Sequence, residues 1–197
     1  MRIGILGGTF NPPHLGHLVC AQEAYIQLGL ERVILIPARQ PPHKPVEDEP
    51  GPEHRLELCR LAVEGDPRFE VSEIELNREG PSYMVDTLSL LHSSVPDTDL
   101  YLILGGDIAA GLPDWHEPER VLSLATVAVA KRRGTPRELV ERSLALLHGA
   151  ERTRFFHMPR IGVSSTFVRE RVCAGLPIRY LVPDPVAGYI ADRGLYR

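Results

Sequence analysis

The sequence has few cysteines and lacks any long apolar run. Its 197 residues include three cysteines, Cys20, Cys59 and Cys173, which are widely spaced and follow no metal-ligand pattern. Buried thiols in a reducing compartment are the interpretation we favour over disulfides. No apolar stretch is long enough to span a bilayer, and the first residues form a strand-like run rather than a signal peptide. We therefore expect a cytoplasmic protein that is not inserted in a membrane.

An excess of positive charge is also absent. Lysine and arginine number 22 against 26 aspartates and glutamates, which gives a formal net charge of −4. This balance offers no electrostatic footprint for a nucleic-acid polymer, so we expect no such partner. A small anionic ligand must then be bound by a local cluster of donors. The length and the 43% hydrophobic content fit one globular domain over residues 1–197.

Short apolar runs alternate with stretches of helical spacing. The runs, each bounded by glycine, proline or charge, lie at 2–6, 32–37, 69–74, 100–104, 126–130 and 154–158. The apolar stripes between them are Leu18, Ala21, Tyr25 and Leu28; Leu56, Cys59, Leu61 and Val63; Val85, Leu88 and Leu91; and Leu139, Ser143, Leu146 and Leu147. This alternation predicts an α/β fold, a Rossmann-like doubly wound parallel sheet of five to six strands with helices on both faces. A small helical portion at about 164–197 and a long loop at 37–52 over the carboxyl edge complete the expectation.

Residues 7–17, GGTFNPPHLGH, concentrate glycine, proline and histidine directly after the first apolar run. The glycines do not form the G-x-G-x-x-G fingerprint of dinucleotide sites, and the second run ends in Pro37-Ala38 without an acidic residue for a ribose. A strand, a glycine turn and a helix starting near His17 remain, which is the arrangement that binds phosphate. His14 and His17, three residues apart across Gly16, can face one point in front of the sheet.

A second phosphate-binding pattern lies near the C-terminus. Ser164, Ser165 and Thr166 stand where a helix should begin, and Gly175 where it should end. Arg169 follows one turn into that helix. Free N–H groups, the helix dipole and a guanidinium together favour an anion.

These stretches resemble the nucleotidyltransferase superfamily, whose H-x-G-H signature reads His14-Leu15-Gly16-His17 here. Further matches are VSSTFVR at 163–169, PPHK at 41–44, REGPSY at 78–83, Asp86-Thr87, GGD at 105–107, Trp115, YLVP at 180–183 and GLY at 194–196. Together they cover nearly the whole chain in order and are similar to one branch, the bacterial nicotinate-nucleotide adenylyltransferases.

The resemblance implies adenylyl transfer from ATP to nicotinate mononucleotide, with release of pyrophosphate. It implies catalytic roles for His14, His17 and Arg169. The ATP-binding residues it implies are Gly7, Gly8, Thr9, Phe10, His14, His17, Ser164, Ser165, Thr166 and Arg169. Those for the second nucleotide are Lys44, Tyr83, Met84, Thr87, Gly106, Asp107, Trp115 and His116. Mg²⁺ should bind mainly through ATP phosphates and water, so no side chain is assigned to a metal.

Three positions depart from the branch pattern, and all lie on the side expected to bind the pyridine nucleotide. They are Ala38, Met84 and His116, where asparagine, a hydroxyl residue and tyrosine are frequent. The alternatives are a sister enzyme such as phosphopantetheine adenylyltransferase, an enzyme that accepts both nicotinate and nicotinamide nucleotides, and a noncatalytic dinucleotide-binding module. The sequence leaves open whether the chain forms a homo-oligomer.

Overall fold

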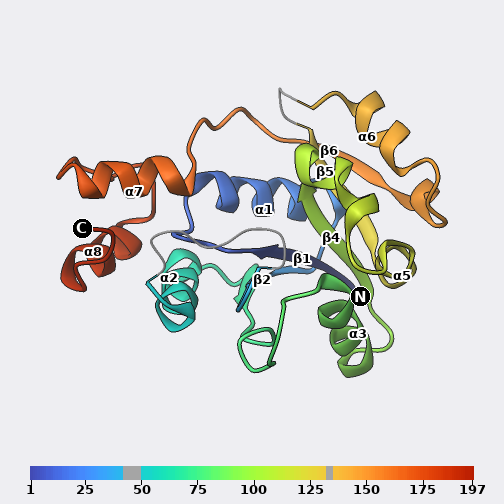
Figure 1. The fold of residues 1–197 in the computed structure, drawn as a ribbon, viewed down its shortest axis with the longest axis horizontal. Helices are drawn as coiled ribbons and strands as arrows, with labels where there is room; N and C mark the ends of the chain where they lie inside the picture. Colours follow the sequence, from blue (N-terminus) through green and yellow to red (C-terminus); the bar gives the residue numbers. More distant parts are fainter. Residues whose placement is uncertain (42–49, 132–134) are drawn as a thin grey trace.

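The computed structural model describes residues 1–41, 50–131 and 135–197, and it shows one six-stranded parallel sheet (Figure 1). The strands are β1 (Arg2–Gly8), β2 (Arg32–Pro37), β3 (Phe69–Val71), β4 (Asp99–Gly105), β5 (Thr126–Lys131) and β6 (Arg154–His157). Their order in the sheet is β3-β2-β1-β4-β5-β6. The predicted α/β doubly wound sheet is confirmed.

Helices connect the strands. They are α1 (Leu15–Leu28), α2 (Pro52–Val63), α3 (Met84–Ser94), α4 (Gly106–Ala110), α5 (Pro118–Leu124) and α6 (Arg137–Leu144), with 3-10 turns at Leu112–Asp114 and Ala150–Arg152. Two helices, α7 (Ser165–Cys173) and α8 (Asp184–Asp192), follow the last strand. Figure 1 places α7 and α8 at one end of the molecule, beside α2, and α5 and α6 toward the other.

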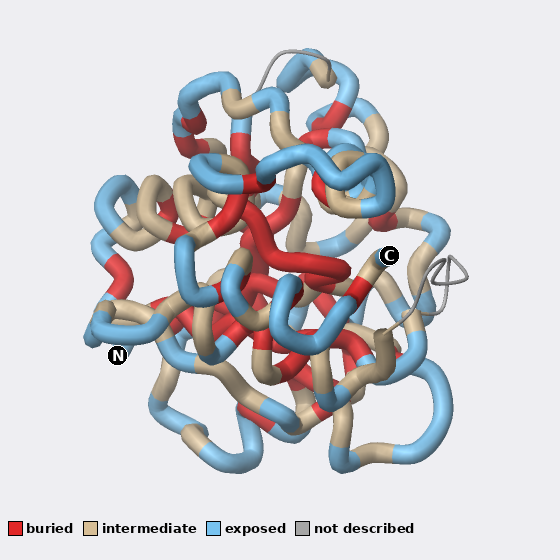
Figure 2. The backbone as a smooth tube through the Cα atoms, turned by 90° about the vertical axis from the view of Figure 1, so that its left-hand side faces the viewer, coloured by how far each residue is buried: buried red, intermediate tan, exposed pale blue. Residues whose placement is uncertain are grey.

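The alternating side chains of β1 explain why both faces of the sheet are covered. Ile3 and Ile5 pack into a core cluster that includes Val85 of α3 and Val121 of α5. Leu6 belongs to the opposite cluster, with residues of α1 and α2. The central strands are therefore apolar on both sides, as in other parallel sheets. In Figure 2 the buried residues lie at the centre of the molecule and exposed loops surround them.

The C-terminal helices share a third, smaller cluster with α2. Val168 of α7 and Val186 and Ile190 of α8 pack against Leu58, which is fully buried. The backbone N–H of Leu15 also donates to the carbonyl of Leu181 at 3.0 Å. These contacts fasten residues 165–197 beside the carboxyl end of β1.

Several element boundaries differ from the sequence-based expectation. β3 ends at Val71 rather than at residue 74. The N–H of Ser72 makes a last hydrogen bond to the carbonyl of Leu35. The chain then turns, because the N–H of Ile74 donates to the Ser72 hydroxyl instead of to the neighbouring strand. In α6 the buried side chains are Val140 and Leu144. The predicted stripe was wrong there, since Leu146 lies beyond the helix and is 92% exposed.

The cysteines also correct the expectation of buried thiols. None of the three forms a disulfide; Cys59 is buried, Cys20 is partly buried and Cys173 is exposed. Burial raises the pKa of the Cys59 thiol. Among the described residues, no helix is both long and apolar enough to cross a membrane. Residues 42–49 of the expected 37–52 loop lie outside the described residues.

Candidate functional site

The two predicted histidines meet at the start of α1. The backbone N–H of Gly16 donates to Nδ1 of His14 at 3.1 Å, and the backbone N–H of His14 donates to Nδ1 of His17 at 3.2 Å. This reciprocal pattern is a capping box in which two imidazoles replace the usual hydroxyl and carboxyl. The helix begins at Leu15, two residues earlier than expected, because His14 satisfies its first donors.

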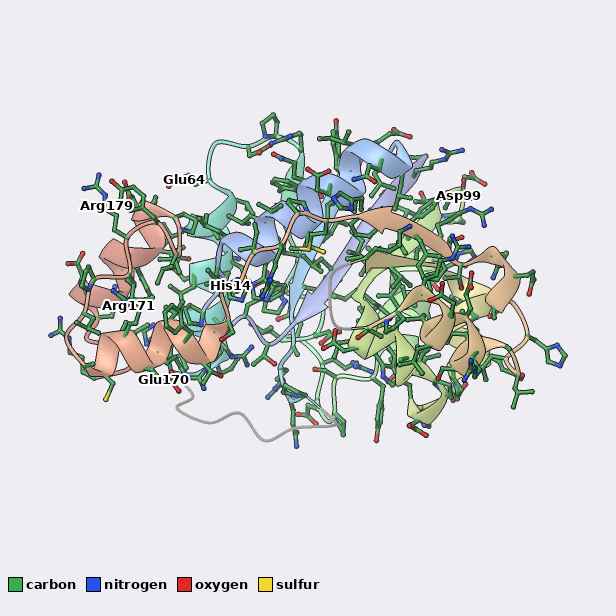
Figure 3. All side chains as sticks on the ribbon, turned by 90° about the horizontal axis from the view of Figure 1, so that it is seen from above. His14, Glu64, Asp99, Glu170, Arg171 and Arg179 are labelled. Atoms are coloured by element: carbon green, nitrogen blue, oxygen red, sulfur yellow. The ribbon has the colours of Figure 1, made fainter. Side chains whose placement is uncertain are left out.

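The same hydrogen bonds determine where each ring carries its proton. Because both Nδ1 atoms accept backbone N–H groups, the neutral rings are protonated on Nε2. The rings stack with centroids 3.8 Å apart and planes inclined by 30°. A side chain at position 16 would reach within 2.9 Å of the His14 ring, so the glycine allows this ring to fold over the helix start. Figure 3 shows His14 beside the sheet, on the side of α7 and α8.

A cavity of about 270 Å³ lies in front of these rings. His14, the N-cap of α1, lines it together with Gly16 and His17 of the first turn, Gly7 of β1 and Ser164, the N-cap of α7. Asp107, expected on the pyridine side, also lines this cavity. The cavity therefore combines imidazole donors with two helix starts at the carboxyl edge of the parallel sheet, where α/β folds bind ligands.

A second cavity, of about 340 Å³, adjoins the first. Gly7, Leu104 and Ile108 line both. The residues specific to the second cavity include Tyr83, Met84, Trp115 and His116, which were expected on the pyridine side. Gly8 and Thr9, which were expected on the ATP side, line it too, as do Ala38, Pro41, Glu75 and Ser82. Two molecules bound in these cavities would meet beside Gly7.

Aromatic rings shape the second cavity. The rings of Tyr83 and His116 lie 4.5 Å apart between centroids, with planes inclined by 35°. Trp115 is partly buried, packs against the main core cluster and also lines the cavity. It therefore joins the core to the wall of the cavity.

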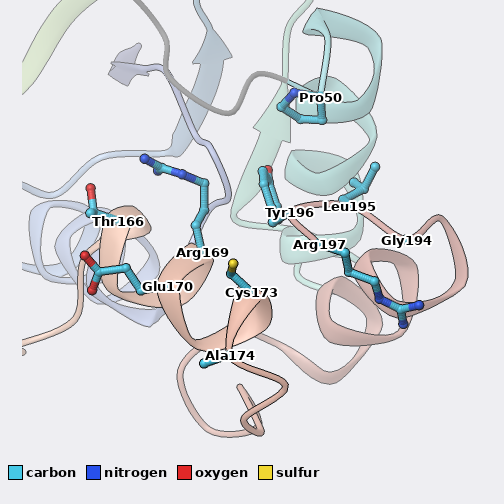
Figure 4. Close-up of a pocket in the computed structure, with 10 residues that line it drawn as sticks. All are labelled: Pro50, Thr166, Arg169, Glu170, Cys173, Ala174, Gly194, Leu195, Tyr196 and Arg197. Atoms are coloured by element: carbon cyan, nitrogen blue, oxygen red, sulfur yellow. The ribbon is translucent and has the colours of Figure 1, made fainter.

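Helix α7 follows the serine-rich pattern. Ser164 is its N-cap, with the N–H of Phe167 donating to its hydroxyl at 3.1 Å. The Ser165 hydroxyl donates to the carbonyl of Pro12 at 2.8 Å, and Arg169 Nη1 donates to the carbonyl of Asn11 at 3.0 Å. Thr166 and Arg169 line a third cavity, of about 770 Å³, between α7 and the C-terminal residues (Figure 4).

A buried carboxyl at the second cavity was not anticipated from the sequence. Glu75 accepts a hydrogen bond from the Thr87 hydroxyl at 2.7 Å. Burial raises its pKa, while hydrogen bonds from Thr87 and Ser82 and the charge of Arg78 act in the opposite direction. The Ser82 oxygen also accepts the backbone N–H groups of residues 39 and 40 at 3.0 and 3.2 Å. No local sequence signal marks Glu75, because its partners come from two other segments.

The role of Arg55 at the site was also not predicted from the sequence. This arginine of α2 is fully buried, and its guanidinium donates to the carbonyls of Thr9 at 2.9 Å and Ala38 at 2.6 Å. It thereby joins the ends of β1 and β2 at the cavity. In the sequence Arg55 resembles any charged residue of an amphipathic helix.

Four expected residues take other positions or cannot be placed. Thr87 lies behind the cavity wall, fully buried and bonded to Glu75. Phe10 is buried with its ring 5.1 Å from that of His17, supporting the histidine. Gly106 is buried against Thr135 at the start of α4. Lys44 lies outside the described residues.

Comparisons with known proteins agree with this geometry. Residues 5–171 match the model of the cytidylyltransferase-like family. The chain is 49% identical over 197 residues to a probable nicotinate-nucleotide adenylyltransferase of Roseiflexus sp. (strain RS-1), covering 99% of this chain and 98% of that protein. It is 41% identical to the nicotinate-nucleotide adenylyltransferase of Bacillus subtilis (strain 168), covering 99% of this chain and 98% of that one. The chain belongs to this adenylyltransferase family.

Solved structures show the same fold. Nicotinic acid mononucleotide adenylyltransferase of Plasmodium falciparum, complexed with NaAD, superposes with a TM-score of 0.77 at 17% identity, covering 99% of this chain and 97% of that chain. In its complex with APC the TM-score is 0.76 at 16% identity, with coverages of 99% and 96%. At these identities the likeness establishes the fold of the family, and the residues must be argued from the site itself.

Proposed function

We propose that this protein transfers the adenylyl group of ATP to nicotinate mononucleotide, forming nicotinic acid adenine dinucleotide and pyrophosphate in NAD biosynthesis. The observation that carries the proposal is the pair of adjoining cavities. One offers two imidazoles and a helix cap for phosphates, and the other offers aromatic rings for a planar base. They share Gly7, which has no side chain to separate two reacting phosphates.

The reaction requires positioning rather than a covalent enzyme intermediate. A phosphate oxygen of the mononucleotide attacks the α-phosphorus of ATP, and the bond from that phosphorus to the departing pyrophosphate breaks. Charge grows on the equatorial and leaving oxygens, so donors fixed in place lower the barrier. His14 and His17 fit this role, because their Nδ1 atoms are held by the backbone and their Nε2–H groups serve as donors.

The remaining phosphate contacts come from β1 and α7. The backbone of Gly7, which lines both cavities, would cradle the adenylyl group, with Gly8 and Thr9 beside it toward the second cavity and Phe10 behind. Ser164, Ser165 and Thr166 lie at a helix start, where N–H groups and the dipole favour the β- and γ-phosphates. Arg169 would add a guanidinium on the same helix, and Lys44 is proposed to add a further charge.

The pyridine nucleotide would bind in the second cavity. Trp115, Tyr83 and His116 supply flat surfaces for its ring. The carboxylate of nicotinate would face the first turn of α3, at Met84, where backbone N–H groups point out of the helix. Gly106, Asp107 and Thr87 are further proposed substrate-side residues, with Thr87 acting through Glu75.

Mg²⁺ is proposed to bind through ATP phosphates and water. The described residues hold no group of three or more side chains suited to a metal, and Asp107 is a carboxylate at the histidine cavity. This donor set fits a hydrated ion that the phosphates carry in, since Mg²⁺ loses its waters reluctantly. When bound, the ion would neutralise charge on the departing pyrophosphate.

We further propose that residues 1–197 act as a single nucleotidyltransferase domain, because Ser164, the N-cap of α7, lines the histidine cavity and Val168 of α7 shares a core cluster with Leu58 of α2. A pyrophosphate-release assay with ATP and each acceptor in turn tests the function. Release with nicotinate mononucleotide is expected. Release only with phosphopantetheine would instead indicate the sister enzyme, and no release with any acceptor would indicate a binding module.

A further inference from the structure

The penultimate residue of the chain reaches the turn that carries the histidines. The hydroxyl of Tyr196 donates to Oδ1 of Asn11 at 2.7 Å, across 185 residues of sequence. Asn11 is buried, and it begins the Asn-Pro-Pro segment that leads into His14. The side chain of Tyr196 is visible between α7 and α2 in Figure 4.

Three further contacts from the same part of the chain bind this turn. Ser165 donates to the carbonyl of Pro12, and Arg169 to the carbonyl of Asn11. The carbonyl of Leu181 accepts the N–H of Leu15. Four C-terminal residues therefore contact the turn: Ser165, Arg169, Leu181 and Tyr196. The Tyr196 contact is to a side chain of the turn, whereas the three further contacts are to its backbone.

The backbone at both ends of the Tyr196–Asn11 contact is strained. Tyr196 has φ of +62° and Phe10, next to Asn11, has φ of +50°. Residues other than glycine avoid this left-handed region, so surrounding contacts must hold them there. Leu195 anchors the end of the chain, because it is buried in the α7–α8 cluster and its N–H donates to the carbonyl of Ile190 at 3.0 Å.

Small shifts of the turn matter for the histidines. The His14 ring is oriented by the N–H of Gly16 and the His17 ring by the N–H of His14, so both rings follow the backbone. A misplacement of reacting groups by about 1 Å can cost on the order of a hundredfold in rate. Whatever fixes Asn11 therefore also fixes the donors presented to the phosphates.

We infer that Tyr196 is a positioning residue for adenylyl transfer: its hydroxyl holds the Asn11 side chain and, through it, the turn that carries His14 and His17. This inference rests on the function proposed above. Tyr196 acts through Asn11 and touches no reacting atom in this assignment.

The chain supplies a matched control for this inference. Tyr189 of α8 also uses its hydroxyl to join the C-terminal portion to the rest of the molecule, with Nδ1 of His54 in α2 at 2.9 Å. Tyr189→Phe and Tyr196→Phe remove the same atom, and each removes a hydrogen bond between the C-terminal portion and the rest of the molecule. Only Tyr196 contacts the histidine turn.

The experiment measures kcat, KM and the melting temperature of the full-length wild type and both variants. We expect Tyr196→Phe to lower kcat about tenfold to hundredfold and to leave KM for nicotinate mononucleotide within about twofold. Tyr189→Phe should keep kcat within about twofold of wild type. Unchanged kcat in Tyr196→Phe, or an equal loss in both variants, would overturn the inference.

A second measurement separates this inference from the proposed function. The NMR signals of the His14 and His17 rings can be assigned with variants in which one of these histidines is replaced. These signals should shift in Tyr196→Phe and remain in place in Tyr189→Phe. Ring signals unmoved by Tyr196→Phe would contradict positioning even in an active enzyme. Wild-type protein that releases no pyrophosphate would instead refute the proposed function, while the ring signals would still report whether Tyr196 positions the turn.

Discussion

The backbone N–H of His14 donates to the ring of His17, and the two imidazoles stack 3.8 Å apart. The ring of His14 in turn accepts the backbone N–H of Gly16, so the backbone at the start of α1 orients both rings. The glycine between them is the residue that lets the rings close over the backbone. The arrangement therefore presents two donors to one cavity.

His17→Ala should lower kcat by about two to four orders of magnitude, the range for losing a preorganised donor to transition-state charge. The change also removes one acceptor of the capping box, which should cost about 1 kcal/mol of stability. Steady-state kinetics and thermal unfolding measure both effects. His92→Ala, at an exposed position of α3, is the control and should change neither. Near-normal turnover of His17→Ala would remove this histidine from the reaction.

Arg55 should contribute to stability far more than its neighbour on the same helix. Arg55→Met leaves the carbonyls of Thr9 and Ala38 without this buried donor. We expect the free energy of unfolding, measured in urea, to fall by on the order of 2–4 kcal/mol. Arg60→Met is the matched control, because Arg60 is exposed and its partners are Glu57 and Glu73. The free energy of unfolding of Arg60→Met should fall by no more than about 1 kcal/mol. Equal losses in the two variants would show that Arg55 does not fasten the strand ends.

Glu75 should make stability depend on pH in a defined direction. Because burial raises its pKa, the folded protein binds more protons than the unfolded chain above the ordinary glutamate pKa of about 4.3. The stability contributed by Glu75 is complete below that pH and is lost as pH rises through the raised value.

Glu75→Gln tests this dependence. Urea unfolding between about pH 4 and pH 8 should show the glutamine variant gaining stability relative to wild type as pH rises. Glu73→Gln, at an exposed carboxyl two residues away, serves as the comparison for surface charge. A difference between Glu75→Gln and wild type that stays constant with pH would contradict the assignment.

Substrate choice should favour nicotinate over nicotinamide mononucleotide by at least about a hundredfold in kcat/KM, near 2.7 kcal/mol. Backbone N–H groups at the start of α3 suit a carboxylate, whereas an amide would set its own N–H₂ against them. Equal kcat/KM for the two nucleotides would show that Ala38, Met84 and His116 create a dual-specific pocket.

Trp115→Ala should raise KM for both nucleotides and leave their ratio unchanged, because stacking does not distinguish acid from amide. A ratio that moves with this substitution would place Trp115 against the carboxylate rather than the ring.

The sequence by itself determined the elements and their class. Runs such as Val33–Ile36 are apolar without alternation because both faces of a parallel strand are buried, and that pattern can be read locally. The histidine turn and the serine-rich helix start were also local signals, since capping involves residues within four positions of each other. The pattern failed for Leu146, which follows the helical spacing but lies beyond the end of α6.

Only the tertiary structure decided which distant groups meet. Tyr196 contacts Asn11, Arg55 contacts the ends of two strands, and Glu75 receives Thr87 at the cavity wall. Local sequence does not mark Arg55 or Glu75 as buried, and it marks Tyr196 and Thr87 only as parts of short motifs, without their partners. Their roles come from the crossover connections of the sheet, which bring strand ends and the C-terminal helices to one edge, where burial leaves each polar group dependent on the partner that the fold supplies.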